Sequence, residues 1–330
     1  MSEVVTDRRA GAGAGRFNWQ RVAEYVIVVA IVAESAVFAA IAPQFLSVPN
    51  LVNVALSIAI TGILAVGMTM VILTGGIDLS VGSVVALAGV AAAMLAGDGG
   101  WGVAAGAGAA VGIGLAVGLF NGVVVARFNV PPFVTTLAML TICRGLAFVV
   151  TGGRSVGNLP EGFGFVGKER VLGVPLPVLL MVLVFAAGWF LLRHTVFGRY
   201  VYAVGGNREA AFLAGVNTKL VTALVYVING LLVGLAGFVL ASRLGAGVPN
   251  AGIQYELDVI AAVVVGGTSL TGGRGSVIGT FWGAVFIGVL NNGLNLHGVD
   301  PYMQKIALGV VLLLAVLADQ LGKSRGGLKT

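Results

Sequence analysis

The sequence predicts an all-α polytopic membrane protein with about ten transmembrane helices. Hydrophobic residues make up 58% of the 330 residues and charged residues 10%, whereas an average soluble domain carries about 25% charged residues. The mean hydropathy of +1.02 agrees with this class. Long apolar segments recur, and Lys and Arg gather at their ends rather than on one face. That distribution is typical of membrane orientation and argues against a nucleic-acid partner.

Ten segments are candidates for spanning helices, because crossing a hydrocarbon layer of about 30 Å takes about 20 apolar residues. The first exceeds the roughly 7–15 residues of a signal-peptide core, so it is predicted to be a retained span. The eighth has only Val259–Val265 as its apolar part, so we expect it to be broken or re-entrant where protein shields its backbone. The predicted helices are 21–42, 51–73, 78–97, 101–125, 133–150, 174–194, 218–241, 256–266, 275–296 and 302–320.

Basic residues predict the orientation. When ten spans are assumed, most Lys and Arg, including those of both tails, fall on one side, and the positive-inside rule assigns that side to the cytoplasm. Two cytoplasmic ends need an even number of crossings, so ten is favoured over nine. The predicted organisation is a cytoplasmic tail at 1–20, a transmembrane domain at 21–320 with a cytoplasmic loop at 195–217, and a cytoplasmic tail at 321–330.

Small residues at four-residue spacing predict close helix packing in two places. Such stripes let helix backbones approach closely where lipid offers no hydrophobic gain for association. Packing inside the bundle is favoured over a dimer seam, because a ten-helix bundle has more internal than external contacts. The stripes are Gly102, Gly106, Ala110, Gly114, Gly118 and Gly122, and then Gly275, Gly279 and Gly283.

Two regions are similar in a way that predicts inverted internal repeats. Asn121 is followed by Pro132 at the start of a helix, and Asn291 is followed at nearly the same spacing by Pro301 at the start of another. In the predicted topology the first turn faces the cytoplasm and the second faces outside. Inverted repeats give transporters two interchangeable faces about a midplane axis.

Glycine pairs interrupt the chain at two candidate structural or gating sites. Asp78 or Ser80 can cap the helix after the first pair, which places a carboxylate at a positive helix end. Glu256 and Asp258 stand in a similar way before the short eighth segment. Ionisable residues inside a membrane are functional candidates by default, and capping or anchoring is the alternative for these carboxylates. The glycine pairs are Gly75 with Gly76 and Gly266 with Gly267.

The loop at 195–217 is a long polar interruption with several positive charges. Asn207 can cap a short helix, the residues from Arg208 to Leu213 are mostly good helix formers, and Gly215 can end the helix in a left-handed conformation. A helix of about three turns is predicted. A basic helical loop of this kind suits contact with a cytoplasmic partner, and the alternative is a solvated loop without one.

Three segments resemble the membrane subunit of ribose-type bacterial ABC sugar importers, within a similarity that runs from about residue 42 to 321. They are MTMVILTGGIDLSVGSVVALAG (68–89), GRYVYAVGGNREAAFLAGVN (198–217) and YELDVIAAVVVGGTSLTGGRGSVIGTFWGAVFIGVLNNGLNLHGV (255–299). The resemblance implies that two copies of the chain form a pore in the lipid of the bacterial inner (plasma) membrane. It also implies a cytoplasmic ABC ATPase, which holds ATP and Mg²⁺ while this chain binds no cofactor, and an extracytoplasmic sugar-binding protein.

The resemblance also implies where the ATPase binds. Glu209, Ala210, Ala211 and Gly215 match the EAA-and-glycine signature by which such permeases resemble one another at the ATPase contact, where small alanines would fit a groove on the partner. The candidate coupling residues are Gly205, Gly206, Asn207, Arg208, Glu209, Ala210, Ala211 and Gly215.

Polar side chains within the predicted spans are candidates for the sugar path. Hydroxyl-rich neutral solutes need hydrogen-bond donors and acceptors rather than charge, and amides supply both. Hydrogen bonding between helices is the alternative explanation. Arg144, inside a span, has three open roles: pairing with Asp78, pairing with Glu34 or lining the pore. The path candidates are Asn121, Thr135, Thr136, Asn291, Asn292 and Asn295.

An ion-gradient-driven secondary transporter of small polar solutes is the alternative function, because inverted repeats and broken helices fit it equally well. Proton coupling usually needs embedded acids, and Glu34 is the one carboxylate well inside a predicted span. One cysteine and two histidines predict neither a metal cluster nor a nucleophile–base pair. ATP hydrolysis by this chain is not expected, since Leu317 occupies the first glycine position of a phosphate loop. Pentoses, hexoses and nucleosides all stay open as substrates.

Overall fold

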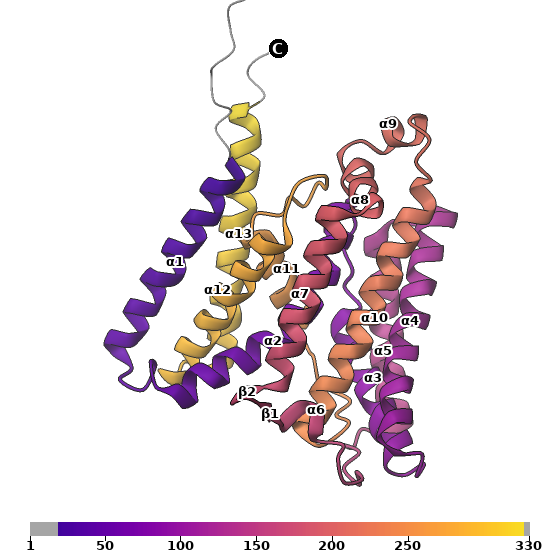
Figure 1. Ribbon diagram of the computed structural model, residues 1–330, viewed down its shortest axis with the longest axis vertical. Coiled ribbons are helices and arrows are strands. Elements are labelled where there is room, and N and C mark those ends of the chain that lie inside the picture. Colours follow the sequence, from indigo (N-terminus) through magenta and orange to yellow (C-terminus); the bar gives the residue numbers. More distant parts are fainter. Residues whose placement is uncertain (1–18, 327–330) are drawn as a thin grey trace, which may run out of the picture.

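The computed structural model describes residues 19–326, and most of them are helical (Figure 1). Residues 1–18 and 327–330 of the predicted tails lie outside the described residues, whereas residues 19–20 begin α1 and residues 321–326 end α13. Each of the ten predicted spans overlaps one helix. These helices are α1 (Trp19–Ile41), α2 (Val48–Leu73), α3 (Val81–Ala96), α4 (Gly102–Phe128), α5 (Pro132–Thr151), α7 (Leu176–His194), α10 (Thr218–Leu244), α11 (Tyr255–Val265), α12 (Val277–Leu296) and α13 (Pro301–Gly326).

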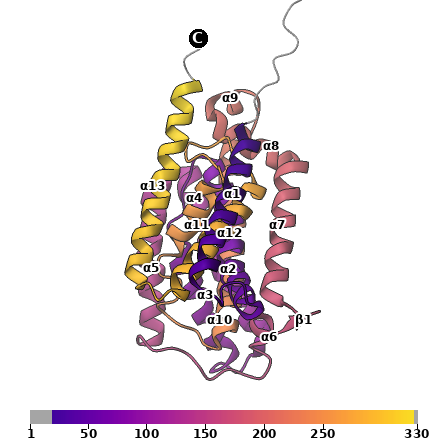
Figure 2. The same ribbon diagram turned by 90° about the vertical axis from the view of Figure 1, so that its left-hand side faces the viewer.

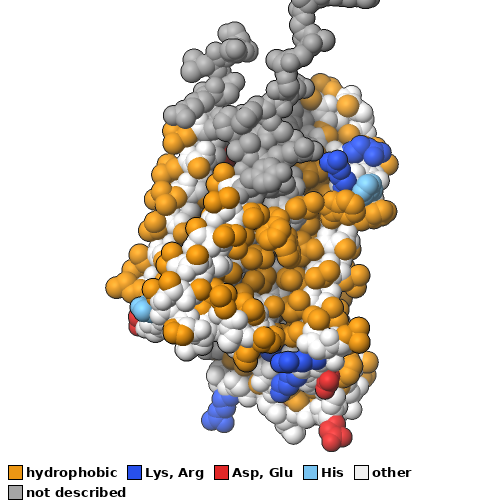
Figure 3. Space-filling model, turned by 60° about the vertical axis from the view of Figure 1, so that its left-hand side comes forward, with side chains coloured by type: hydrophobic (Ala, Val, Ile, Leu, Met, Phe, Trp, Pro, Cys, Tyr) orange, Lys and Arg blue, Asp and Glu red, His pale blue; other side chains and the backbone are white. Residues whose placement is uncertain are grey.

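Seven helices of the described chain are long and apolar enough to cross a membrane, namely α2, α4, α5, α7, α10, α12 and α13. The apolar part of α1, Val26–Ile41, is shorter, as is α3, and α11 has 11 residues. The chain is therefore an all-α polytopic membrane protein by the length and composition of its helices. A broad belt of hydrophobic side chains covers one face of the molecule, and charged side chains lie below it and at its upper right (Figure 3).

Local sequence explains where several helices begin and end. The hydroxyls of Ser47 and Ser276 cap α2 and α12 by accepting backbone hydrogen bonds of 3.4 and 2.9 Å. Pro132 begins α5, at a position where its missing N–H is no loss. Gly152 and Gly245 end α5 and α10 at φ values of 58° and 66°, a left-handed conformation that glycine adopts without a steric penalty.

The helix α2 lies at the centre of the bundle and α13 at its edge. Within α2, 83% of an apolar stretch of 18 residues is buried, whereas only 6% of the corresponding stretch of α13 is buried. The long helix α10 packs against α2, α3 and α4, and α12 packs against α1, α2 and α11. The helices α2 and α10 thus form the framework on which the breaks described below are held.

The small-residue stripe of α4 packs inside the bundle, as predicted. A Cβ on Gly114 would lie 2.7 Å from the nitrogen of Gly234, and a Cβ on Gly118 would lie 3.0 Å from Cα of Gly230, both on α10. Gly102 takes no part, because it has no described atom within 4 Å of a Cβ position. Close contacts also join α4 to α3 and α12 to α11, at Gly106 with Ala92, Gly279 with Gly266 and Gly283 with Ala262.

The connections include short elements that the sequence analysis did not separate. Two short helices, α8 (Val196–Gly206) and α9 (Arg208–Leu213), follow α7, while α6 (Phe165–Lys168) precedes an antiparallel hairpin of β1 (Arg170–Val171) and β2 (Val174–Pro175). The start of α1, the end of α13, α8 and α9 lie at one end of the molecule, and α6 and the hairpin lie at the other (Figures 1 and 2). We call these the α9 end and the hairpin end.

Candidate functional site

The predicted coupling loop forms two short helices rather than one of about three turns. Gly205 and Gly206 end the 11-residue α8, and Asn207 caps the six-residue α9 by accepting a hydrogen bond of 2.9 Å from the N–H of Ala210. Gly215, with φ of 85°, follows α9. The cap and the left-handed glycine are as predicted. The extended backbone of Asn207, with φ of −157° and ψ of 104°, separates α8 from α9. The helix is shorter than predicted because the residues between Asn207 and Gly215 give only about two turns.

The helix α9 presents a mixed surface at the α9 end of the molecule. Arg208 and Glu209 are exposed, and Phe212 and Leu213 are 65% and 78% exposed. Ala211 faces inward and is buried. Large exposed apolar side chains of this kind are available for contact with another molecule.

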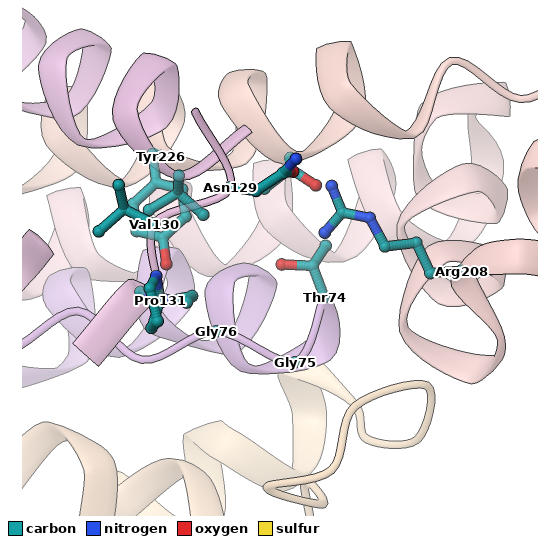
Figure 4. Close-up of a pocket in the computed structure, with 11 residues that line it drawn as sticks. Thr74, Gly75, Gly76, Asn129, Val130, Pro131, Arg208 and Tyr226 are labelled. Carbon is teal, nitrogen blue, oxygen red and sulfur yellow. The ribbon is translucent and has the colours of Figure 1, made fainter. Parts of the chain in front are cut away.

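A cavity of about 340 Å³ lies beside α9, and we call it the α9 cavity. Its wall combines Thr74, Gly75 and Gly76 from the break after α2 with the turn after α4. Figure 4 shows the Arg208 side chain extending from α9 toward Thr74 and Asn129. The candidate coupling helix and the first candidate gating glycines therefore share one cavity.

A buried polar cluster at this break centres on Asp78, which is 3% exposed; we call it the Asp78 cluster. Oδ1 of Asp78 accepts hydrogen bonds from the N–H of Ser80 at 2.9 Å and from its hydroxyl at 2.6 Å. Oδ2 accepts from the amide of Asn229 at 2.8 Å, and the amide of Asn121 donates to the Ser80 hydroxyl at 3.2 Å. Asp78 thus satisfies a backbone N–H at the start of α3, whereas the Ser80 side chain makes no cap hydrogen bond.

Thr135 and Thr136 are both buried, and Thr136 contacts Ile77, the residue before Asp78. The Thr136 hydroxyl lies 3.2 Å from the carbonyl of Ile77 and 3.0 Å from that of Pro132. The Thr135 hydroxyl donates to the carbonyl of Pro131 at 3.4 Å. Both hydroxyls therefore bond to backbone, and only the Thr136 contact with Ile77 joins two segments, as the alternative of hydrogen bonding between helices requires.

Three oxygen atoms near the Asp78 cluster have no hydrogen-bond partner among the described residues. They are Oδ1 of Asn121, Oδ1 of Asn229 and Oη of Tyr226. Buried polar groups are normally bonded, and the free atoms retain capacity for a water molecule or a rearranged partner. Tyr226 also lines the α9 cavity, so the cluster lies next to it.

A second cavity, of about 400 Å³, lies between the start of α2 and the end of α12; we call it the amide cavity. The amides of Asn50 and Asn292 exchange two hydrogen bonds, of 2.9 and 3.0 Å, and so hold α2 against α12. Arg243 adds a hydrogen bond of 3.1 Å to the carbonyl of Leu56. The lining residues are Asn50, Asn53, Ser57, Arg243, Asn291, Asn292, Asn295, Leu296, Gln304 and Lys305.

The structure divides the predicted path residues into two groups. Asn291, Asn292 and Asn295 line the amide cavity, whereas the other three belong to the buried surroundings of Asp78. The sequence analysis missed Asn50 and Asn229, which complete the two groups. Asn229 is the one amide side chain within α10, and that signal would have identified it. Asn50 shares α2 with Asn53 and lies one residue before the predicted span at 51–73.

The short helix α11 is held at its start by a charge pair and at its end, where the second break lies, by glycine packing. Nζ of Lys305 lies 3.3 Å from Oδ1 of Asp258, which joins α11 to α13. Glu256 lies in the first turn of α11 and is half-buried. Gly266 ends α11 against α12, and Gly267 continues the chain with φ of 86°.

Arg144 binds backbone carbonyls. Its Nη1 donates hydrogen bonds of 2.8 Å to the carbonyls of Pro249 and Ala251. In the described chain it therefore ties α5 to the loop before α11, and no hydrogen bond or ion pair joins it to Asp78 or Glu34.

Tyr202 connects α8 to the loop before α12, since its hydroxyl donates to the carbonyl of Gly275 at 3.0 Å. Burial raises the pKa of the Tyr202 phenol above its usual value, and the charge of Arg193 offsets part of that rise. The phenol therefore stays protonated at neutral pH and keeps its donor role.

Known proteins with similar sequences are transport proteins. Residues 50–316 match the family described as branched-chain amino acid transport system / permease component. The chain is 45% identical to the ribose import permease protein RbsC of Escherichia coli (strain K12), over 96% of this chain and 98% of that protein. It is 48% identical to RbsC of Bacillus subtilis (strain 168), over 84% and 87% of the two chains.

A third relative is the L-arabinose ABC transporter permease protein AraH of Azospirillum brasilense, at 39% identity over 96% of this chain and 92% of that protein. No solved structure matches the chain. The resemblance stated from the three sequence segments is confirmed. The chain belongs to this family of permease components of transport systems.

Proposed function

We propose that this chain is the transmembrane permease subunit of an ABC importer and forms the translocation pathway for a monosaccharide, such as ribose or another pentose or hexose. The observation that carries the proposal is the similarity to a ribose import permease over nearly the whole chain. Relatives named for arabinose and xylose transport support the same substrate class. The amide cavity agrees with it, because carboxamides offer the donors and acceptors that neutral hydroxylated solutes need.

The proposed topology has ten crossings, two cytoplasmic ends and inverted internal repeats. In it α3 and α11 are short, broken crossings, and each is completed by the irregular chain at its glycine-rich break. Support comes from the positions of the two turns that the repeats predict. The turn after α4 lines the α9 cavity, whereas the turn between α12 and α13 lies toward the hairpin end (Figure 1). The positive-inside rule makes the α9 end cytoplasmic.

The proposed assembly contains a second copy of this permease chain, a cytoplasmic ABC ATPase that holds ATP and Mg²⁺, and an extracytoplasmic sugar-binding protein, all at the bacterial inner membrane. The exposed surface of α9 is the proposed ATPase contact, supported by the EAA-and-glycine signature of residues 209–215. Exposed apolar side chains along α5 and α13 are the proposed contacts with lipid or with the second copy.

The proposed mechanism alternates access between the two cavities. Movement of α9 driven by the ATPase changes the α9 cavity, because Arg208 forms part of its wall. Closing one cavity while opening the other moves the sugar from the amide cavity inward. Selectivity belongs mainly to the sugar-binding protein, so the pathway needs only weak binding.

Uptake by intact cells tests the proposal. The gene is deleted in its own host and returned on a plasmid, and uptake of radiolabelled ribose, arabinose and xylose is measured. We expect the returned gene to restore uptake of at least one of them. That uptake is expected to persist with a protonophore while ATP is maintained, and to stop when ATP is depleted.

The ion-gradient alternative gives the opposite pattern. Purified chain in liposomes under an imposed ion gradient is expected to accumulate no sugar. Accumulation there without an ATPase, or cellular uptake that follows the proton gradient instead of ATP, contradicts the proposal.

A further inference from the structure

Three segments from distant parts of the sequence meet at the end of α8 through their backbones. The N–H of Gly273 donates to the carbonyl of Leu73 at 2.9 Å. A Cβ on Gly205 would overlap the Leu73 carbonyl oxygen and lie 2.6 Å from the nitrogen of Gly273. A Cβ on Gly273 would lie 2.7 Å from Cα of Gly206. We call the contact between residues 73, 205–206 and 272–273 the glycine junction.

At residues 272–273 the backbone conformation requires glycine, in addition to the close backbone contact. Gly272 and Gly273 have φ values of 85° and 72°, in a region where L side chains are strained. A Cβ on Gly272 would also lie 3.0 Å from the Gly205 oxygen, the Gly75 nitrogen and the Leu73 oxygen. Close backbone contact and backbone conformation therefore both exclude larger residues here.

Each segment of the junction is continuous in sequence with a different candidate functional region. Leu73 ends α2 and begins the break that continues to the Asp78 cluster. Gly272 and Gly273 belong to the loop that continues into α12, whose far end lines the amide cavity. Gly205 precedes α9 by three residues. The junction is thus where the end of α8, just before the proposed ATPase contact on α9, touches the first break and the loop that follows the second.

Two side chains reinforce the same contacts. The Tyr202 hydroxyl holds the carbonyl of Gly275 at 3.0 Å, so α8 is bonded to the loop before α12. Arg208 reaches toward Thr74 at the other break (Figure 4). The link between α8 and the two breaks therefore does not depend on a single contact.

We propose that Gly205 is a positioning residue that transmits movement of α9 to both breaks at once. The inference rests on the proposed function. Backbone packed against backbone has no side-chain rotamers that absorb a displacement, and close-packed contacts of this kind transmit strain. A shift of α8 therefore moves the start of α12 and the break before α3 together, which couples the two cavities.

The test compares alanine substitutions in the deletion host that carries the returned gene. Gly205→Ala is expected to leave the permease in the membrane with its ATPase, while sugar uptake per ATP hydrolysed falls at least tenfold. Gly206→Ala adds the same methyl group one residue later, where no described atom lies within 4 Å, and is expected to be clearly milder. Gly112→Ala, on the outer face of α4 with equally open space, is the unaffected control.

A fourth variant decides the test if Gly205→Ala does not fold. Tyr202→Phe removes one hydrogen bond without adding volume, and it is expected to lower uptake per ATP two- to fivefold at a normal membrane level. The inference is overturned if Gly205→Ala transports like wild type, or if Tyr202→Phe does so when Gly205→Ala does not fold. Equal losses for Gly205→Ala and Gly206→Ala also overturn it. Failure of the wild type to couple uptake to ATP would instead overturn the proposed function.

Discussion

Asp78 shows how a carboxylate can be buried in a membrane protein without a cationic partner. Removing a charge or a polar group from water is costly unless hydrogen bonds replace the lost hydration. Three donors bond Asp78, two from Ser80 and one from Asn229. The bond from Asn229 crosses from α10 to the break before α3, so it stabilises tertiary structure and not only a local turn.

The first prediction concerns this bond. Asn229→Ala is expected to reduce the free energy of unfolding by about 1.5–3 kcal/mol, because a hydrogen bond to a buried carboxylate is lost. Thermal unfolding of the purified protein in detergent measures the change. Asn158→Ala, in an exposed loop, is the control and is expected to stay within about 0.5 kcal/mol of wild type. Equal stability of the two variants would show that the bond contributes nothing.

Residue-level prediction from the sequence succeeded where the partner is local. The Gly-Gly pair followed by Asp78 and Ser80 predicted a helix break with a bonded carboxylate, since both residues are close in the chain. Asn229 is 151 residues away from Asp78, and its partner depends on how α10 packs. The sequence alone therefore identified the carboxylate and missed the amide that bonds it.

At the scale of the element, small residues decide which helices pack most closely. The stripe on α4 brings its backbone against α10, with Gly114 facing Gly230 and Gly234. Lipid is as apolar as the side chains it would replace, so close backbone approach and van der Waals contact hold such a pair together. Close backbone contacts at glycine residues also join α11 to α12.

The second prediction compares two glycines on α4. Gly114→Ala places a methyl group against the α10 backbone and is expected to destabilise the protein by about 1–3 kcal/mol, as overpacking does. Gly112→Ala points into open space and is expected to be neutral or stabilising, because alanine favours the helix by up to about 1 kcal/mol. Unfolding in detergent measures both. A Gly114→Ala variant as stable as Gly112→Ala would contradict the proposed packing.

Helix positions were predictable because apolar length alone marks a span, and each predicted span overlaps a helix. The short elements were not. The β1–β2 hairpin has two residues in each strand, too few for a periodic pattern, and Leu172 at its tip has φ of 52°, which its type does not favour. The helix α9 was predicted too long although its cap at Asn207 was correct, because the residues between Asn207 and Gly215 leave room for only about two turns.

At the scale of the whole molecule, the sequence predicted polar path residues but not their separation. Asn121 is buried beside Asp78, whereas Asn291 lines the amide cavity. Similar local sequence, an amide before a proline turn, is found in both places. Their distance follows from the opposite positions of the two turns, which the predicted topology contained, although the path residues were treated there as one set. Two separate polar regions are what alternating access between two faces needs.

The last prediction tests whether the two ends lie on opposite sides of the membrane. Leu172 at the hairpin tip is 100% exposed and Leu213 on α9 is 78% exposed, while the native Cys143 is 1% exposed and gives little background. In spheroplasts with an intact inner membrane, a membrane-impermeant maleimide is expected to label Leu172→Cys and to label Leu213→Cys only after permeabilisation. Labelling of Leu213→Cys in intact spheroplasts would place α9 outside and contradict an ATPase contact there, because the ATPase acts from the cytoplasm.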